Sequence, residues 1–600
     1  MRSPDQAPNP SPEEASSARA LVLLLALTAL VFSPVLFADF IRLDDYSHLF
    51  NNPHLHRKPF DGLVDLWTKP YFNLYIPITY SAWWVLSMLG GLTRQSAWLF
   101  HALNLTIHLV NTALVFGLVR TLLRSRQKPA PQGTDKVSLL AAFVFALHPL
   151  QVESVAWVSE LKGVLSMMFG LLGLLAYCRS GKRVVTALFF LAAMLAKPSA
   201  MVFPGVAFLL DRIFFGKSLR QSVLMPAIYA VLLLPFVFWT KALQPDLNLD
   251  FIPTLGQRLA VSADAFVFCL YKLLLPYPLV VDYGRSPKFV LDHVPGWQIA
   301  LAGLVFLAGL AVVGKAVLRP RPAAEPSAEP WQPLILCGWS IFLLSIAPVL
   351  GLVPFGFQQF STVADHYLYL PLLGISLAVA GLLLRARACV QVSRVAMALL
   401  GVLAGLSFAQ ARHWRSTETL FTRTLQSNPQ SYLGAFSIGD EYLRGGHPEQ
   451  SLPWLQKSLA INPDYLEAQI SLGMAWVQSG NIEAAIDHYH AVIARNPSTL
   501  GSRARSVASL HNNLGMLLLQ IGREDEATEH FRTAVQMFPR SLNAHLNLGN
   551  VAMANGRYSD ALAEFEKARE LSPNNPGIEQ RLGLARRGLE EAQRNRAPSP

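Results

Sequence analysis

Long apolar runs alternate with short polar loops over the first two thirds of the chain. Between about residues 19 and 411 these runs approach the roughly 20 residues that an α-helix needs to cross a bilayer. Residues 412–600 instead have the pattern of ordinary soluble helices. The chain is therefore predicted to be all-α, with a polytopic membrane domain over 19–411 and a soluble tail. Residues 1–18 are rich in Pro and Ser, and we expect a disordered N-terminus on the cytoplasmic side.

The first apolar run, 19–38, is predicted to be an uncleaved span that leads into an outer loop over 39–75. A Trp- and Tyr-rich helix over 75–91 is short and suits the headgroup region. The run at 258–275 is expected to form a re-entrant or surface helix. Further spans are expected at about 97–119, 137–150, 163–178, 184–210 (a hairpin of two short helices), 222–240, 297–317, 334–353, 367–385 and 394–411. The total is about eleven crossings.

The net charge of +11 comes largely from Lys and Arg in short loops between the apolar runs. Such loops mark the cytoplasmic face of a membrane protein. The positive charge therefore indicates topology, and no nucleic-acid partner is predicted. With a cytoplasmic N-terminus and an odd number of crossings, the soluble tail lies on the opposite side. We expect a bacterial inner membrane with a periplasmic tail.

The soluble tail repeats itself at a fixed period, which is the clearest pattern in the sequence. A Leu-Gly or Ile-Gly pair recurs at 34-residue spacing, except for one spacing of 42 residues. Small residues stand where two helices must approach closely, as in tetratricopeptide (TPR) repeats. Four repeats are predicted at 432–465, 466–499, 508–541 and 542–575. A half repeat and linker over 412–431 precedes them, and a capping helix and tail over 576–600 follows, as a solenoid needs.

Two adjacent carboxylates, Asp44 and Asp45, follow the first span directly. They could form the solvated start of a helix, because Asp favours N-cap positions. They could also supply a general base or a metal ligand, because neighbouring carboxylates in a dry cleft push one pKa upward. Either residue is thus a catalytic candidate, and the sequence leaves open whether they bind a divalent cation.

Other ionisable groups are placed on the same outer side by this topology. Lys197 stands at the turn of a hairpin, where it could snorkel or hold a phosphate, and Lys162 and His366 could assist it. His148 and Glu153 could cap a hairpin or support a site, and Asp365 could contact a charged headgroup. The remaining groups on this side are His54, His56 and Asp282. No Walker loop, HExxH site, CxxC pair or GxSxG elbow is present.

Five motifs stand in a fixed order before the repeats: LDDYSHLFNNPHL, LFHALNLTIHLVNTALVF, FALHPLQVESVAWVSELKGVLS, LAKPSAMVFPGVAFLLD and ADHYLYLPLLG. In this order and with TPR repeats after them, they resemble the transmembrane-and-TPR O-mannosyltransferase family, which belongs to the GT-C membrane glycosyltransferases. The resemblance covers nearly the whole chain. The sequence departs from related ones at three positions. Leu161 and His366 stand where related sequences often carry Arg, and Gly163 stands where they often carry Asp or Asn.

The resemblance implies a sugar, mannose in the family, carried on a polyprenyl phosphate and transferred to Ser or Thr hydroxyls on the non-cytoplasmic side. It implies that Asp44 or Asp45 is the catalytic acid of the first outer loop, and the predicted cations would hold the lipid phosphate. The TPR groove would present a protein acceptor, and membrane lipids would surround the spans. A non-catalytic membrane scaffold that recruits partners through its TPRs is the alternative. A transporter would need charges deep within spans and pseudo-symmetric halves, and neither is visible.

Overall fold

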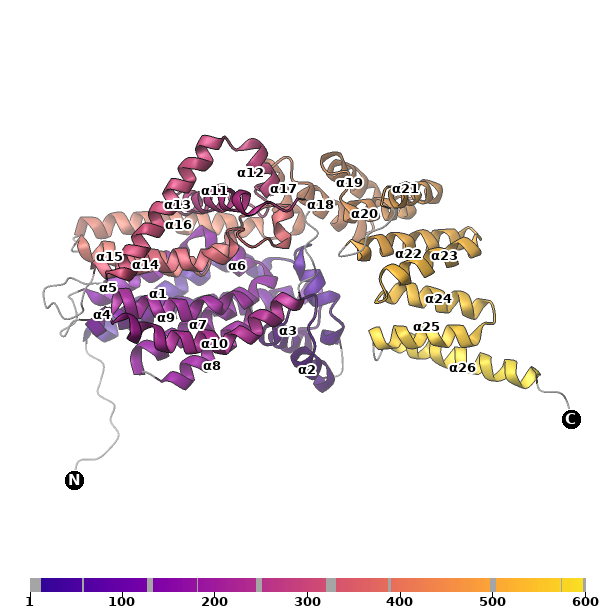
Figure 1. Cartoon of the computed structure of the whole chain (residues 1–600), viewed down its shortest axis with the longest axis horizontal. Helices are drawn as coiled ribbons and strands as arrows, with labels where there is room; N and C mark the ends of the chain where they lie inside the picture. Colours follow the sequence, from indigo (N-terminus) through magenta and orange to yellow (C-terminus); the bar gives the residue numbers. More distant parts are fainter. Residues whose placement is uncertain are drawn as a thin grey trace, which may run out of the picture. The chain divides into compact units, whose positions relative to one another are not determined.

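A computed structural model describes residues 12–56, 59–126, 133–180, 182–243, 251–319, 331–386, 390–496, 503–572 and 575–596. Helices account for most of these residues, and none of them belongs to a β-strand. The chain forms two compact units that divide between Pro429 and Gln430. The all-α prediction is confirmed, and both units can be followed in Figure 1.

The first unit is a bundle of long apolar helices. Its longer helices are α1 (Pro12–Phe32), α3 (Pro77–Gly90), α4 (Ala97–Arg126), α5 (Thr134–Leu147), α7 (Leu161–Ser180), α8 (Arg183–Ala196), α10 (Leu219–Leu243), α11 (Leu255–Leu274), α13 (Gly296–Leu318), α14 (Trp331–Ile346), α15 (Pro371–Arg385), α16 (Val390–His413) and α17 (Thr417–Ser427). The shorter helices α2 (Pro59–Thr68), α6 (Val152–Ala156), α9 (Phe203–Leu209) and α12 (Pro287–His293) lie in connections. Helix α4 packs against both α5 and α7, α8 packs on α7, and α15, which is paired with α14, packs on α5.

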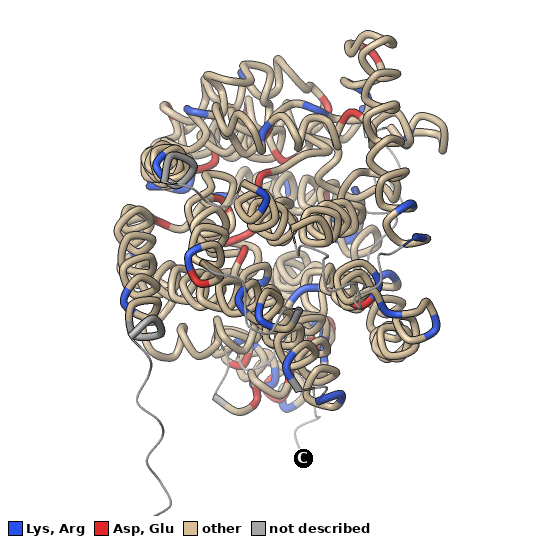
Figure 2. The backbone as a smooth tube through the Cα atoms, turned by 90° about the vertical axis from the view of Figure 1, so that its left-hand side faces the viewer, with Lys and Arg blue, Asp and Glu red and all other residues tan. Residues whose placement is uncertain are grey.

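Seven helices among the described residues are long and apolar enough to cross a membrane. They cover Ser16–Phe37, Arg94–Ser125, Val158–Arg179, Leu219–Leu243, Gly296–Leu318, Trp331–Val349 and Arg394–His413. An eighth crossing is possible where α5 bends by 54° into the segment Pro149–Ala156. The first unit is therefore a multi-pass membrane domain, while the count of about eleven spans stays a prediction. Charged residues lie mainly at helix ends and in loops (Figure 2).

The buried face of α4 carries a row of polar side chains. Asn104 donates through Nδ2 to the carbonyl of Trp157 (2.9 Å), and Asn111 donates to the carbonyl of Val164 (2.9 Å). His108 lies 3.1 Å from the carbonyl of Ala146. These three carbonyls come from the end of α5, from the connection between α5 and α7, and from the first turn of α7. The row thus holds this connection, which we call the tip (residues 148–163), in one position.

The second unit consists of antiparallel helix pairs followed by a longer helix. The helices are α18 (Tyr432–Arg444), α19 (Pro448–Ile461), α20 (Leu466–Gln478), α21 (Ile482–Arg495), α22 (Ala504–Gln520), α23 (Glu524–Met537), α24 (Leu542–Ala554), α25 (Tyr558–Leu571) and α26 (Pro576–Arg596). Each pair is closed by a glycine with positive φ in its inner turn, at Gly446, Gly480, Gly522 and Gly556. Such a position favours Gly because it has no Cβ.

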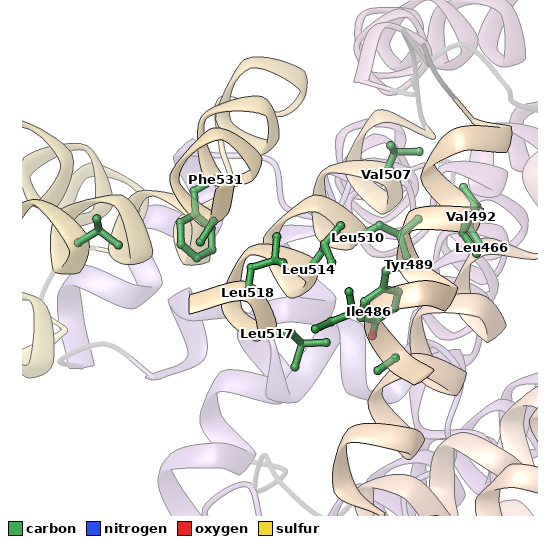
Figure 3. Packing of buried hydrophobic residues seen from close by; sticks show 13 residues of the cluster. Leu466, Ile486, Tyr489, Val492, Val507, Leu510, Leu514, Leu517, Leu518 and Phe531 are labelled. Carbon is green, nitrogen blue, oxygen red and sulfur yellow. The ribbon is translucent and has the colours of Figure 1, made fainter. Parts of the chain in front are cut away.

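Aromatic rings fill the space beside the small residues of these repeats. A Cβ on Gly473 would overlap the ring of Tyr489, and a Cβ on Gly549 would overlap that of Phe565. Side chains of α20 and α21 and those of α22 and α23 form one buried cluster, shown in Figure 3. The first helices of successive pairs also contact one another directly. Each repeat therefore buries its apolar face against the next, as expected for a solenoid.

Candidate functional site

Asp45 is fully buried at the start of the loop that follows α1. Its Oδ1 accepts hydrogen bonds from the backbone N–H (2.9 Å) and the hydroxyl (2.5 Å) of Ser159. Its Oδ2 accepts from the backbone N–H of Ile41 (2.9 Å). Burial raises the pKa of Asp45 to about 6, against the lowering effect of these hydrogen bonds. The side chain therefore connects the loop after α1 to the tip, and both of its oxygens face protein.

Asp44 has a different environment, although it is the neighbouring residue. Its side chain is 44% exposed, and its Oδ2 lies 3.8 Å from the Nζ of Lys162. Lys162 Nζ lies 3.6 Å from Glu160 Oε1, and the Nζ of Lys197 lies 2.8 Å from Glu160 Oε2. These four side chains form a continuous row of alternating charge, which we call the charged row (Asp44, Lys162, Glu160, Lys197).

Three separate segments supply the charged row. Asp44 comes from the loop after α1, and Glu160 and Lys162 come from the tip and the start of α7. Lys197 stands in extended backbone between α8 and a short 3-10 segment beginning at Pro198. The Pro ring ends helical hydrogen bonding there, which leaves Lys197 at a break in the hairpin. Of the predicted residues, Asp44, Lys162 and Lys197 thus come together.

His366 and Glu153 form a second pair beside this row. His366 Nδ1 lies 2.6 Å from Glu153 Oε1, and both residues are largely buried. The indole of Trp157 stands between the pair and the row, because its ring centroid is 5.6 Å from the His366 ring and 5.6 Å from Lys162 Nζ. A buried Glu within hydrogen-bond distance of a His nitrogen orients the ring. This pair therefore borders the same region as the charged row.

Asp365 and His148 lie outside the charged row. Asp365 accepts a hydrogen bond from the hydroxyl of Tyr283 (2.7 Å), and burial raises its pKa well above the ordinary range. His148 accepts from the N–H of Leu150 (3.3 Å), and its Nε2 lies 3.0 Å from the carbonyl of Leu273. His148 therefore caps the turn at the end of α5, and Asp365 packs against the segment before α12. The side chain of His56 lies outside the described residues.

Glu160 is the member of the row that sequence reasoning missed. It is 1% exposed and contacts both lysines. The available signal was its position in the tip between two apolar runs, where an unpaired carboxylate is costly. Among the residues that the structure describes, no group of three or more His, Cys, Asp or Glu side chains is arranged to hold a metal ion.

Sequence models of the tetratricopeptide repeat family match residues 464–540 and 512–576 of this chain. Among solved structures, the crystal structure of MamA aligns with 28% of this chain and 92% of its own length, at 22% identity and a TM-score of 0.23. That score is too low to support an argument, so the TPR assignment rests on the family models and the repeat packing.

Curated relatives cover much more of the chain. Human "Protein O-mannosyl-transferase TMTC3" is 21% identical over 96% of this chain and 66% of its own length. "Protein O-mannosyl-transferase F38B6.6" of Caenorhabditis elegans is 20% identical over 74% of this chain and 63% of its own length. "Protein O-mannosyl-transferase Tmtc1" of Drosophila melanogaster is 29% identical over 29% of this chain and 21% of its own length.

These relatives confirm the resemblance to the transmembrane-and-TPR O-mannosyltransferase family. The chain spans about two thirds of the length of the TMTC3 relatives that it matches.

Proposed function

We propose that this protein is a membrane glycosyltransferase that moves mannose from a polyprenyl phosphate to Ser or Thr hydroxyls of a protein. The observation that carries the proposal is the charged row, in which the half-exposed Asp44 carboxylate lies 3.8 Å from Lys162. A base and a phosphate-binding cation are thus adjacent at one surface. The names of the relatives support the same reaction.

The reaction needs a base and a cation in these places. The acceptor oxygen attacks the anomeric carbon of the sugar, and its proton passes to the Asp44 carboxylate. The bond between the anomeric carbon and the phosphate oxygen breaks, and its electron pair leaves with the polyprenyl phosphate. Lys162 and Lys197 stabilise the charge that develops on that phosphate. The products are a mannosyl-protein and a polyprenyl phosphate.

The surrounding residues position this machinery. Asp45 fixes the backbone that carries Asp44, because its carboxylate binds both Ile41 and Ser159. Glu160 holds the two lysine ammonium groups near each other through its two oxygens. His366, oriented by Glu153, donates to the phosphate or to the sugar from the far side of Trp157. Asp365 and His148 support the fold around the tip.

The TPR array suits the role of acceptor holder, because stacked repeats present an extended surface to polypeptides. The proposed setting is a bacterial inner membrane with the N-terminus in the cytoplasm and the TPR unit in the periplasm. In this arrangement the charged row faces the compartment in which acceptor proteins arrive.

The experiment measures transfer by the full chain in lipid nanodiscs, with polyprenyl-phosphate mannose as donor and a Ser/Thr-containing peptide as acceptor. Loss of a positioned base costs about 10²- to 10⁴-fold in rate, so Asp44→Asn should lower kcat by that factor while donor binding persists. Asp61→Asn is the matched control, because Asp61 is exposed on α2 in the same loop and contacts none of the row. Equal rates for Asp44→Asn and wild type would remove Asp44 as the base.

The scaffold alternative predicts a different result. Two results together would favour a non-catalytic TPR scaffold. The wild-type chain would transfer no sugar in nanodiscs, and deleting its gene from cells would leave the Ser- and Thr-linked hexose of their proteins unchanged. Glycopeptide mass spectrometry of envelope proteins from both cell lines makes this comparison.

A further inference from the structure

The first outer loop contains a turn with unusual backbone geometry. Phe72 has φ of +48° and Asn73 has φ of +60°, and they are the only non-glycine residues with positive φ in the described part of the chain. The turn is closed on both sides: the N–H of Tyr71 donates to the carbonyl of Leu74 (3.0 Å), and the N–H of Leu74 donates back (2.9 Å). The geometry is therefore defined by hydrogen bonds at both ends.

Phe is a poor choice for this position on grounds of folding alone. Bulky side chains rarely adopt the left-handed region, because Cβ crowds the neighbouring carbonyl, whereas Gly enters it freely and Asn tolerates it. Residues kept in such conformations cluster at functional sites, where surrounding contacts hold them in place. The Phe72 side chain therefore offers something that Gly would not.

The turn is attached directly to the segment that begins with Asp44. The hydroxyl of Tyr71 lies within hydrogen-bond distance of the carbonyls of Ser47 (3.0 Å) and Asn51 (2.8 Å). The Phe72 ring meets the His48 ring edge-on, with centroids 5.3 Å apart. His48 follows Asp44 by one helical turn, and the Asp44 charge raises the pKa of His48 against the larger lowering effect of burial. The Phe72 ring thus lies near the proposed base.

The ring remains available to a ligand, since 41% of Phe72 is exposed. Its aromatic contacts, His48 and Tyr71, supply no fixed positive charge, and burial lowers the pKa of His48 to about 4. A lipid phosphate needs cations, and in the described part of the chain Lys162 and Lys197 of the charged row supply them. The neighbourhood of Phe72 therefore suits the carbon-rich part of an uncharged group that approaches Asp44.

A membrane role fits another part of the loop better. Phe60, Val64 and Trp67 are exposed at i, i+4 and i+7 along α2, as in a helix that lies in the bilayer interface. Phe72 lies outside this helix, in the turn that follows it. Its ring contacts His48 of the segment that begins with Asp44, whereas the exposed α2 side chains follow the periodicity of their own helix.

We propose that Phe72 is an acceptor-binding residue, whose ring packs against the polypeptide beside the Ser or Thr that receives the sugar. The inference rests on the proposed function and adds a specificity element to it. The left-handed turn presents the ring at a fixed angle, and His48 supports it from the protein side. A platform of this kind favours acceptors with an apolar or carbon-rich residue next to the hydroxyl.

The test compares Phe72→Gly with Asn73→Gly in the full chain in nanodiscs, using polyprenyl-phosphate mannose and a Ser/Thr peptide. Both changes allow the turn its backbone conformation, but only Phe72→Gly removes the ring. We expect Phe72→Gly to raise the acceptor KM about tenfold, as truncation of an aromatic anchor does, with the donor KM within about twofold of wild type. Its melting temperature should not fall. Asn73→Gly should leave both KM values unchanged, and Phe72→Tyr should retain the wild-type acceptor KM.

Three outcomes would overturn the assignment. An unchanged acceptor KM in Phe72→Gly would show that the ring contacts no acceptor, and a rise confined to the donor KM would place it on the sugar or lipid. A lower melting temperature with equal changes in both KM values would show a structural role.

Peptide binding measured in the Asp44→Asn background separates this inference from the proposed reaction. Phe72-dependent peptide binding without any transfer by wild type would contradict the proposed reaction and support the acceptor site. Transfer by wild type that is unchanged in Phe72→Gly would support the proposed reaction and contradict the acceptor site.

Discussion

Replacing Asp45 by Asn should change how the stability of the membrane unit depends on pH. Burial raises the pKa of this carboxyl from 3.8 to about 6. The folded state thus favours the protonated form, and the associated stability is complete below pH 4 and lost as pH rises through 6. The full difference is about 2 pH units, or about 3 kcal/mol. About 1.5 kcal/mol of it is lost between pH 5 and pH 7.5.

The amide of the Asp45→Asn variant cannot titrate, so the variant lacks this loss. The two oxygens of Asp45 accept from the N–H groups of Ile41 and Ser159, and the amide replaces one of these oxygens by an NH₂ group. Two donors then face each other, and a buried N–H without an acceptor costs about 1–3 kcal/mol. Near pH 5 the variant should therefore be less stable than wild type. Near pH 7.5 the gap should narrow by about 1.5 kcal/mol, because wild type then buries a charged carboxylate.

The assay is unfolding of the full chain in nanodiscs at several pH values between 5 and 8, for wild type, Asp45→Asn and the exposed control Asp61→Asn. Other titrating groups cancel in the difference between variants. Parallel curves for wild type and Asp45→Asn would refute the reasoning, because they would mean that Asp45 titrates alike in the folded and unfolded states. A large kcat loss in Asp45→Asn at unchanged stability, together with a wild-type kcat in Asp44→Asn, would move the base to Asp45.

Three further predictions concern other contacts. Glu160→Gln leaves two neighbouring lysines without their buried counter-charge, so the free energy of unfolding should fall by about 3 kcal/mol in denaturant titrations; an unchanged midpoint would contradict the charged row. Gly549→Ala places a methyl group on an aromatic ring and should cost about 1–3 kcal/mol, whereas Gly583→Ala meets open space and should cost nothing in the same thermal scan. The His545–Glu564 hydrogen bond (2.5 Å) raises the pKa of His545 and lowers that of Glu564. Its stabilisation is lost below about pH 4.5 and as pH rises through the raised His545 pKa, so Glu564→Gln should lower the melting temperature most between about pH 4.5 and 6.5; a pH-independent difference would count against this pair.

The sequence predicted the helical repeats well because their signal is periodic. A Gly must stand where a helix meets an aromatic ring, as Gly473 meets Tyr489, and the same need returns in each unit. The membrane unit carries no such period. Its length pattern predicts apolar helices, but short segments such as α8 and α9 do not reveal whether they cross or turn back.

The sequence predicted which residues of the candidate site lie on the same face, but not which role each of them has. Topology placed Asp44, Lys162 and Lys197 on one face, and the structure brings them together. Which of the two aspartates is buried depends on Ser159, more than 100 residues away in sequence. Neighbouring residues in a loop have the same local pattern, so only this distant contact separates Asp45 from Asp44.

The polar row on α4 shows why the tip could adopt this shape. His, Asn and Thr side chains inside a span are usually interpreted as functional, because burying them is costly. Here Asn104 and Asn111 instead donate to carbonyls on both sides of Glu160, at Trp157 and Val164. The polar positions of α4 therefore bind the chain on both sides of Glu160, and through these contacts they help to fix where Glu160 and Lys162 stand.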